Sequence, residues 1–116
     1  MNSETKELWL KALRSGNYGQ SKYHLHDENG YCCLGVLLDC YMQSPDNKMK
    51  WRKAEVGSIY WFDDSSWYCI AFLPNTRQFR QWTGDLSRKD QRILSRMNDA
   101  ECKTFDQIAN WIEKNL

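Results

Sequence analysis

Twelve consecutive residues, Tyr31 to Met42, restrict the fold more than any other part of this 116-residue chain. Their apolar side chains recur at helical spacing and cover almost the whole circumference of the helix they would form. A helix that is apolar on nearly every side is buried, so other elements must pack around it. The sequence therefore predicts a central helix over about residues 32–42, in which Gly35 lets another element approach the backbone closely.

A β-hairpin is predicted over about residues 58–72. Two runs rich in aromatic and β-branched side chains, Ile59–Phe62 and Trp67–Phe72, flank residues 63–66, which have the composition of a four-residue turn. Neither face of this hairpin is polar, so both faces must be covered. Helices of the chain can cover one face. The other face needs more helices, a second subunit or a ligand.

Helices are also predicted near both ends of the chain. Ser3 is the expected N-cap of the first helix, whose apolar stripe includes Leu8, and Gly16 supplies its left-handed end. Thr104 is the expected N-cap of the last helix. Together these elements predict an α+β fold, in which a small antiparallel sheet packs with the buried central helix and with the N- and C-terminal helices. The length of the chain predicts a single domain over residues 1–116.

Charge and cysteine content narrow the classes of function. The formal net charge is only +1, which does not favour a general nucleic-acid partner. The five cysteines form no C-x-x-C pair, and no apolar run approaches the length that spans a bilayer. No secretory signal is visible at the start of the chain. We therefore expect reduced thiols in a cytoplasmic protein, with no membrane, no metal and no cofactor.

The sequence contains two groups of reactive side chains, and neither is favoured as a functional site. Cys32 with His24 or His26 could form a thiol nucleophile and its base, but Cys33 belongs to the apolar stripe of the central helix, which indicates packing. The two histidines with Asp27 could bind a metal, but three such residues are too few to be specific. The sequence thus predicts a protein without catalytic residues.

A candidate ligand site follows the first helix, where residues 18–26 are predicted to be extended. Polar donors, cations and an aromatic ring with flexible glycines between them suit an anionic or nucleotide-like ligand. Rings of the hairpin would stack on a base. The predicted ligand-binding residues are Arg14, Tyr18, Gln20, Lys22, His24, Trp61 and Trp67.

Three stretches together resemble a family of small proteins encoded by tailed bacteriophages and prophages. They are Trp9–Gln20 (WLKALRSGNYGQ), Cys32–Leu37 (CCLGVL), and Asn98–Asp99 with Phe105–Leu116 (FDQIANWIEKNL). The resemblance covers both ends of the chain and thins out between about residues 43 and 72. It implies a phage origin and a place in the host cytoplasm, and it implies no particular activity.

Small phage proteins without catalytic motifs often act against host defences, and by that analogy three functions can be ranked. The first is sequestration of a nucleotide-derived immune signal. The second is a protein-binding inhibitor of a host defence complex, similar to an anti-CRISPR protein, which would use an exposed aromatic patch. The third is a small cysteine-dependent enzyme. A homodimer would cover the second face of the hairpin.

Overall fold

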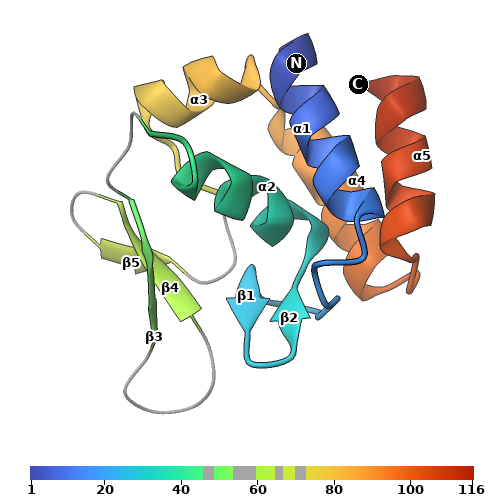
Figure 1. The fold of residues 1–116 in the computed structure, drawn as a ribbon, viewed down its shortest axis with the longest axis horizontal. Helices are drawn as coiled ribbons and strands as arrows, with labels where there is room; N and C mark the ends of the chain where they lie inside the picture. The colour runs from blue at the N-terminus through green and yellow to red at the C-terminus, as the bar shows by residue number, and fades with distance from the viewer. Residues whose placement is uncertain (46–48, 54–59, 65–66, 70–72) are drawn as a thin grey trace.

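The computed structural model describes residues 1–45, 49–53, 60–64, 67–69 and 73–116, and at 61, 63, 64 and 67–69 it describes the backbone alone. In chain order the elements are α1 (Ser3–Arg14), β1 (His26–Asp27), β2 (Gly30–Tyr31), α2 (Cys33–Met42), β3 (Trp51–Lys53), β4 (Tyr60–Asp64), β5 (Trp67–Cys69), α3 (Arg77–Thr83), α4 (Arg88–Asp99) and α5 (Phe105–Asn115). Figure 1 shows α1, α4 and α5 on one side of α2 and the three-stranded sheet on the other. The predicted α+β class is confirmed.

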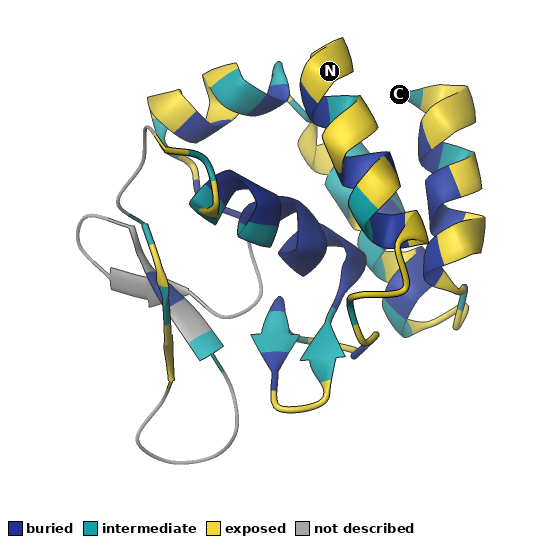
Figure 2. Ribbon diagram, in the orientation of Figure 1, coloured by how far each residue is buried: buried dark blue, intermediate teal, exposed yellow. Residues whose placement is uncertain are grey.

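The central helix is confirmed as α2, which is buried at every position except Asp39 and Met42. Figure 2 shows it as an almost continuously dark blue ribbon in the middle of the molecule. Helices α1 and α4 both pack against it. The indole Nε1 of Trp9 in α1 donates a hydrogen bond of 3.0 Å to the carbonyl of Cys33, so a polar contact also fixes the two helices.

Gly35 allows the close approach that the sequence predicted. A Cβ atom at this position would overlap the backbone carbonyl of Leu25, which is fully buried. The same carbonyl accepts a hydrogen bond of 3.1 Å from the backbone N–H of Cys32. The segment before β1 therefore lies directly against the first turn of α2, and only glycine fits between them.

The C-terminal helices begin where their capping signals lie. Thr104 and Gln107 form a complete capping box at the start of α5, and the Ser87 side chain caps α4 by accepting from the N–H of Asp90. Each bond satisfies a backbone N–H that has no partner within its helix. These two helix starts could be predicted from the sequence because a capping bond involves only residues close in the sequence.

Asn2 joins the start of α1 to the end of α3. Its backbone N–H donates to Thr83, and its side-chain Nδ2 donates to the carbonyls of Gln81 and Trp82 at 2.8 and 3.0 Å. The prediction that Ser3 is the N-cap of the first helix is wrong, because α1 begins at Ser3 and Asn2 is the capping position. The Asn2 side chain makes no capping bond, since it satisfies the last carbonyls of α3 instead.

A second correction concerns the exposed side of α1 and the segment after it. Leu8, predicted in the apolar stripe, is 46% exposed, and Thr5 and Leu10 are buried in its place beside Trp9.

The segment at residues 18–26 is not simply extended, because Tyr23 has a φ of +71°. The side chain of Tyr23 is 67% exposed. Its N–H donates to Asp99 Oδ1, and this bond compensates for the left-handed backbone.

The buried side chain of Asn98 in α4 anchors the segment that follows α1. Its fully buried side chain accepts from Gln20 Nε2 at 2.9 Å and from the Cys33 N–H at 3.2 Å, and it donates to the Ser21 carbonyl at 2.8 Å. One amide thus links α4, the start of α2 and the segment after α1. Buried polar groups of this kind are costly unless fully hydrogen-bonded, and this one is.

The strands form two small antiparallel sheets. Strands β1 and β2 pair around a turn at residues 28–29, and β3, β4 and β5 lie in that order in the second sheet. The predicted hairpin is present in β4 and β5. Asp63 and Asp64, predicted in its turn, are instead paired strand residues opposite Tyr68 and Trp67.

Candidate functional site

Arg14 and Gln20 of the predicted ligand site form hydrogen bonds with different parts of the molecule. Arg14 Nη2 contacts Glu113 Oε2 and Asn110 Oδ1 of α5, both at 2.9 Å. Gln20 Nε2 donates to Asn98 and to the Lys103 carbonyl. These donors are already used within the molecule, and the Arg14 side chain lowers the pKa of Glu113 by its hydrogen bond and its charge.

Lys22 is paired with an exposed cysteine in the turn between α4 and α5. Its Nζ lies 2.8 Å from Cys102 Sγ, and Cys102 has a φ of +54°. The hydrogen bond to Cys102, followed by its charge, raises the pKa of Lys22. Lys22 therefore remains a cation on the surface, separate from Arg14 on the face between α1 and α5.

Tyr18 belongs to a hydrogen-bonded group around Asp39, the polar position of α2. Its hydroxyl donates to Asp39 Oδ2, Gln43 Nε2 donates to the same oxygen at 2.7 Å, and Trp51 Nε1 donates to Oδ1 at 3.0 Å. Burial, and then the hydrogen bond to Asp39, raise the pKa of Tyr18. This group fastens β3 and the segment after α1 to the central helix.

His24 lies beside a serine and an aspartate without forming a catalytic arrangement. Ser21 Oγ donates to Asp27 Oδ2, and His24 Nδ1 is 3.7 Å from that oxygen, too far for a hydrogen bond. Burial raises the pKa of Asp27, but the bonds from Ser21 and two backbone N–H groups and the charge of His24 outweigh it, and the net shift is downward. The Ser21 hydroxyl thus donates its hydrogen bond to the Asp27 carboxylate and not to His24.

The second histidine is the middle of a column of rings. His26 stacks on Tyr31 with ring centroids 3.9 Å apart and on Tyr60 at 4.0 Å, with Trp51 at its edge. Its Nδ1 donates to the carbonyl of Gly30 at 2.7 Å, because a carbonyl oxygen can only accept.

Only one face of the predicted hairpin can be assigned. Tyr60 stacks on His26 and Phe62 is fully buried, so this face packs on the rest of the same chain. The side chains of Trp61 and Trp67, predicted to stack on a ligand, lie outside the described residues. The prediction that a hairpin face contacts a second molecule therefore concerns the opposite face.

The cysteines of α2 are placed for packing. Cys32, Cys33 and Cys40 are buried, and burial raises the pKa of Cys32 and of Cys40 to about 11 and that of Cys33 as well. Thiols with raised pKa values are poor nucleophiles at neutral pH, because the thiolate is the reactive form. Within the described ranges, no group of three His, Cys, Asp or Glu residues could hold a metal, and no helix is long and apolar enough to cross a membrane.

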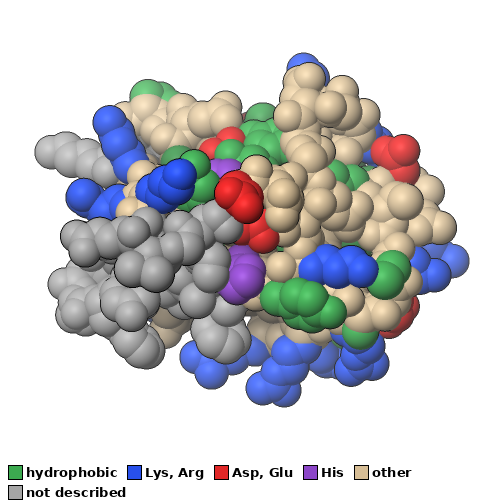
Figure 3. Space-filling view, turned by 90° about the horizontal axis from the view of Figure 1, so that it is seen from below, with side chains coloured by type: hydrophobic (Ala, Val, Ile, Leu, Met, Phe, Trp, Pro, Cys, Tyr) green, Lys and Arg blue, Asp and Glu red, His purple; other side chains and the backbone are tan. Residues whose placement is uncertain are grey.

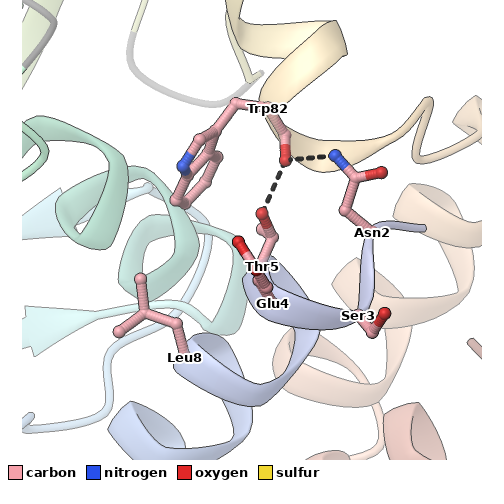
Figure 4. Close-up of a pocket in the computed structure, with 6 residues that line it drawn as sticks. All are labelled: Asn2, Ser3, Glu4, Thr5, Leu8 and Trp82. Carbon is pink, nitrogen blue, oxygen red and sulfur yellow. Dashed lines mark hydrogen bonds between the residues drawn. The ribbon is translucent and has the colours of Figure 1, made fainter.

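The structure also shows a hollow that the sequence did not predict. It lies between the start of α1 and α3, has a volume of about 460 Å³, and is lined by Asn2, Ser3, Glu4, Thr5, Leu8 and Trp82. Figure 4 shows Leu8 and the Trp82 ring at one end of it and the polar side chains along the rest. Thr5 Oγ1 donates to the Trp82 carbonyl at 2.6 Å, which holds the two helices together there. The one sequence feature that relates to this hollow is Leu8, a large apolar residue adjacent to the buried stripe of α1.

A second feature missed from the sequence is the outward face of α4. Arg88, Lys89, Arg92 and Arg96 are all exposed on it, opposite the buried Leu94. The spacing of the arginines was visible in the sequence, but its meaning depends on knowing which face of the helix is buried.

Comparison with known proteins places the chain in one family. Searches of curated proteins and of solved structures found no match. The model of a family described as "Domain of unknown function (DUF8296)" matches residues 1–116, and the chain therefore belongs to that family.

Proposed function

We propose that the protein is a non-catalytic binding protein of phage or prophage origin, which acts in the host cytoplasm by occupying the surface of a host defence protein. The observation that carries the proposal is the hollow between α1 and α3. Leu8 is 46% exposed at one end of the hollow beside the half-buried Trp82, and polar side chains line the rest (Figure 4). Protein–protein contacts combine apolar and polar side chains in this way, and tryptophan is prominent among the residues that dominate binding energy.

Binding is favoured over catalysis by how the reactive groups are used. The thiols of Cys32 and Cys33 are buried with raised pKa values, and the Ser21 hydroxyl donates to Asp27 instead of to His24. The Cys33 thiol donates to the Leu94 carbonyl and the Cys32 sulfur accepts from the Gly35 N–H, so neither buried thiol is hydrogen-bonded to a histidine that could activate it. The phage origin and the role against host defences rest on the resemblance described above and on analogy.

Sequestration of a nucleotide-derived signal is the second candidate, supported by the size of the hollow. A volume of about 460 Å³ is in the range of small-molecule sites, and the Trp82 ring could stack on a base. Two observations favour a protein partner over it. The Glu4 carboxylate in the rim opposes a phosphate, and Arg14 and Gln20, expected to bind the ligand, are bonded within the molecule.

The proposal is tested with bacteria that carry defined defence systems. Expression of the wild-type protein is expected to restore phage plating in at least one such strain, and Leu8→Asp is expected to abolish the effect because it places a charge at the apolar end of the hollow. Asn17→Asp, which adds the same charge on an exposed loop, is the matched control and is expected to behave as the wild type. Equal expression and equal melting temperature establish that Leu8→Asp is folded.

A thermal-shift measurement separates the two candidates. Cyclic di- and trinucleotides at 100 times their dissociation constant would stabilise the protein by about 2.7 kcal/mol. A shift that is lost in Leu8→Asp supports the nucleotide, and no shift together with restored plating supports the protein partner. If Leu8→Asp restores plating as well as the wild type does, the hollow is not the functional surface.

A further inference from the structure

The outward face of α4 carries four exposed cations and is a second surface to be explained. Arg88, Arg92 and Arg96 follow one another at intervals of four residues, so their side chains lie along one side of the helix, and Lys89 flanks them. The row from 88 to 96 is about 12 Å long at the rise of an α-helix. Figure 3 shows Lys and Arg side chains gathered along one edge of the lower side of the molecule.

These cations have no partner in the described part of the chain. No hydrogen bond or ion pair joins the side chain of Arg88, Lys89, Arg92 or Arg96 to another described residue. Asp99 lies on the same side of α4, but its Oδ1 accepts from the Tyr23 N–H and from Asn98 Nδ2. The row is therefore open to a molecule outside the protomer.

The stability of α4 does not account for the row. Like charges at positions i and i+4 repel each other, and both Arg88–Arg92 and Arg92–Arg96 have this spacing. Arg88 and Lys89 also lie in the first turn, where the helix dipole favours carboxylates over cations. An arrangement that the isolated fold disfavours in two ways points to a role in binding.

We propose that this basic face of α4 binds a row of carboxylates on an acidic helix of a partner protein. Arginine offers a planar fork of donors that pairs with both oxygens of a carboxylate, and three of the four cations are arginines. Carboxylates four residues apart on a facing helix match the spacing of the row. This proposal does not depend on the hollow between α1 and α3, because it uses different residues of a different helix.

An acidic protein is favoured over nucleic acid by the charge of the rest of the chain. The formal net charge of +1 falls to −3 when the four cations are set aside. Duplex DNA carries about one negative charge per 1.7 Å and would extend well beyond a row of about 12 Å. The remaining surface would repel those additional phosphates, whereas an acidic segment of matching length places its charge only on the row.

The test uses a fluorescein-labelled, alanine-based helical peptide with glutamate at every fourth position. Fluorescence anisotropy is measured with the full chain, with Arg92→Glu/Arg96→Glu, and with Lys11→Glu/Lys114→Glu, which makes the same charge change at exposed sites on α1 and α5. The wild type is expected to bind at low salt about tenfold more tightly than Arg92→Glu/Arg96→Glu, and the control about as the wild type. Affinity should fall as salt is raised, since exposed pairs are screened.

Several results would overturn the proposal. They are equal binding by the two double variants, no binding by the wild type at low salt, and equal binding of a scrambled peptide of the same composition. Tighter binding of mixed-sequence duplex DNA than of the peptide, lost in Arg92→Glu/Arg96→Glu, would assign the face to nucleic acid instead. Arg92→Glu/Arg96→Glu is expected to fold, because it replaces the repulsion between residues 88 and 92 by an attraction and leaves one repulsion between residues 92 and 96, as in the wild type.

Discussion

The helical side of the molecule and its three-stranded sheet are attached to the central part of the chain, α2 with β1 and β2, by different kinds of contact. On the helical side, α1 and α4 pack on α2 through fully buried side chains, and the buried amide of Asn98 adds directional bonds. On the sheet side, the described contacts are stacked rings around His26, the buried Phe62, and the bond from Trp51 to Asp39. Directional bonds in a close-packed interior fix one arrangement, whereas ring stacking tolerates small shifts. We infer that the helical side is the rigid reference against which the sheet is positioned.

Gly35→Ala is expected to have the largest effect, because it separates α2 from the segment before β1. The added methyl group would overlap the Leu25 carbonyl, and backbone cannot move aside as a flexible side chain can. A loss of about 4 kcal/mol in the free energy of unfolding is expected, at the upper end for single substitutions. Gly16→Ala is the control. It has open space for the methyl group but a φ of +76°, so it should lose only about 1–2 kcal/mol. Equal losses in urea denaturation would contradict the close approach.

Phe62→Ala tests whether the sheet can loosen while the helices persist. Truncating a buried phenylalanine costs about 3–5 kcal/mol, and here the loss falls on the sheet side. Amide hydrogen exchange should speed up at residues 51–53 and 60–64 while the amides of α2 remain protected. Uniform loss of protection in both regions would show that they unfold as one unit and would remove the distinction.

Alkaline pH should destabilise the helical side through its buried thiols. The folded pKa of Cys32 is raised by burial from 9.0 to about 11, so the neutral thiol is favoured in the folded state. The stability this contributes is fully present below about pH 9 and is lost as pH rises toward about 11, with a loss of about 2–3 kcal/mol from this group. The free energy of unfolding, measured from pH 7 to 11, should show this decline.

Cys32→Ser is the matched variant for this measurement. Serine does not ionise in this range and is a good N-cap, so it can accept from the Gly35 N–H as the thiol does. The decline between pH 9 and 11 should become shallower while stability at pH 7 is kept. An unchanged slope would assign the alkaline loss to the other buried thiols and tyrosines.

Tyr18→Phe gives the smallest expected effect and sharpens the boundary between the two sides. It removes one of the donors to Asp39, and a single hydrogen bond of this kind contributes about 1 kcal/mol. Because Gln43 and Trp51 still donate to the carboxylate, the sheet should remain attached. Denaturation should report a small loss with an unchanged cooperativity, and a loss above about 3 kcal/mol would mean that Tyr18 holds the sheet itself.

Features that depend on residues close in the sequence could be predicted, whereas features that depend on residues far apart in the sequence could not. The central helix, the hairpin and the cap at Thr104 depend on neighbouring residues, and all three are present. The prediction that Leu8 is buried was wrong because helical periodicity alone does not set the width of the buried stripe, and Leu8 is adjacent in sequence to the buried Trp9. The left-handed backbone at Tyr23 could not be predicted because the hydrogen bond that compensates for it joins the Tyr23 N–H to Asp99, which is far along the chain.

The partners of the predicted ligand-binding residues could not be foreseen for the same reason. Arg14, Gln20 and Lys22 bond to residues between 78 and 99 positions away, and periodicity carries no information at that distance. Grouping them by closeness in sequence suggested one site. In the folded chain they point to separate parts of α4, α5 and the turn between them.

The hydrogen bonds of Asn2 have a practical consequence for anyone who handles the protein. The second residue of the chain closes the end of α3 and forms part of the wall of the hollow with Trp82. Affinity tags or fluorophores fused in front of Met1 would therefore emerge beside the surface proposed to bind a partner. Leu116 lies at the end of α5 and is not one of the lining residues, so a C-terminal fusion does not start within the wall of the hollow.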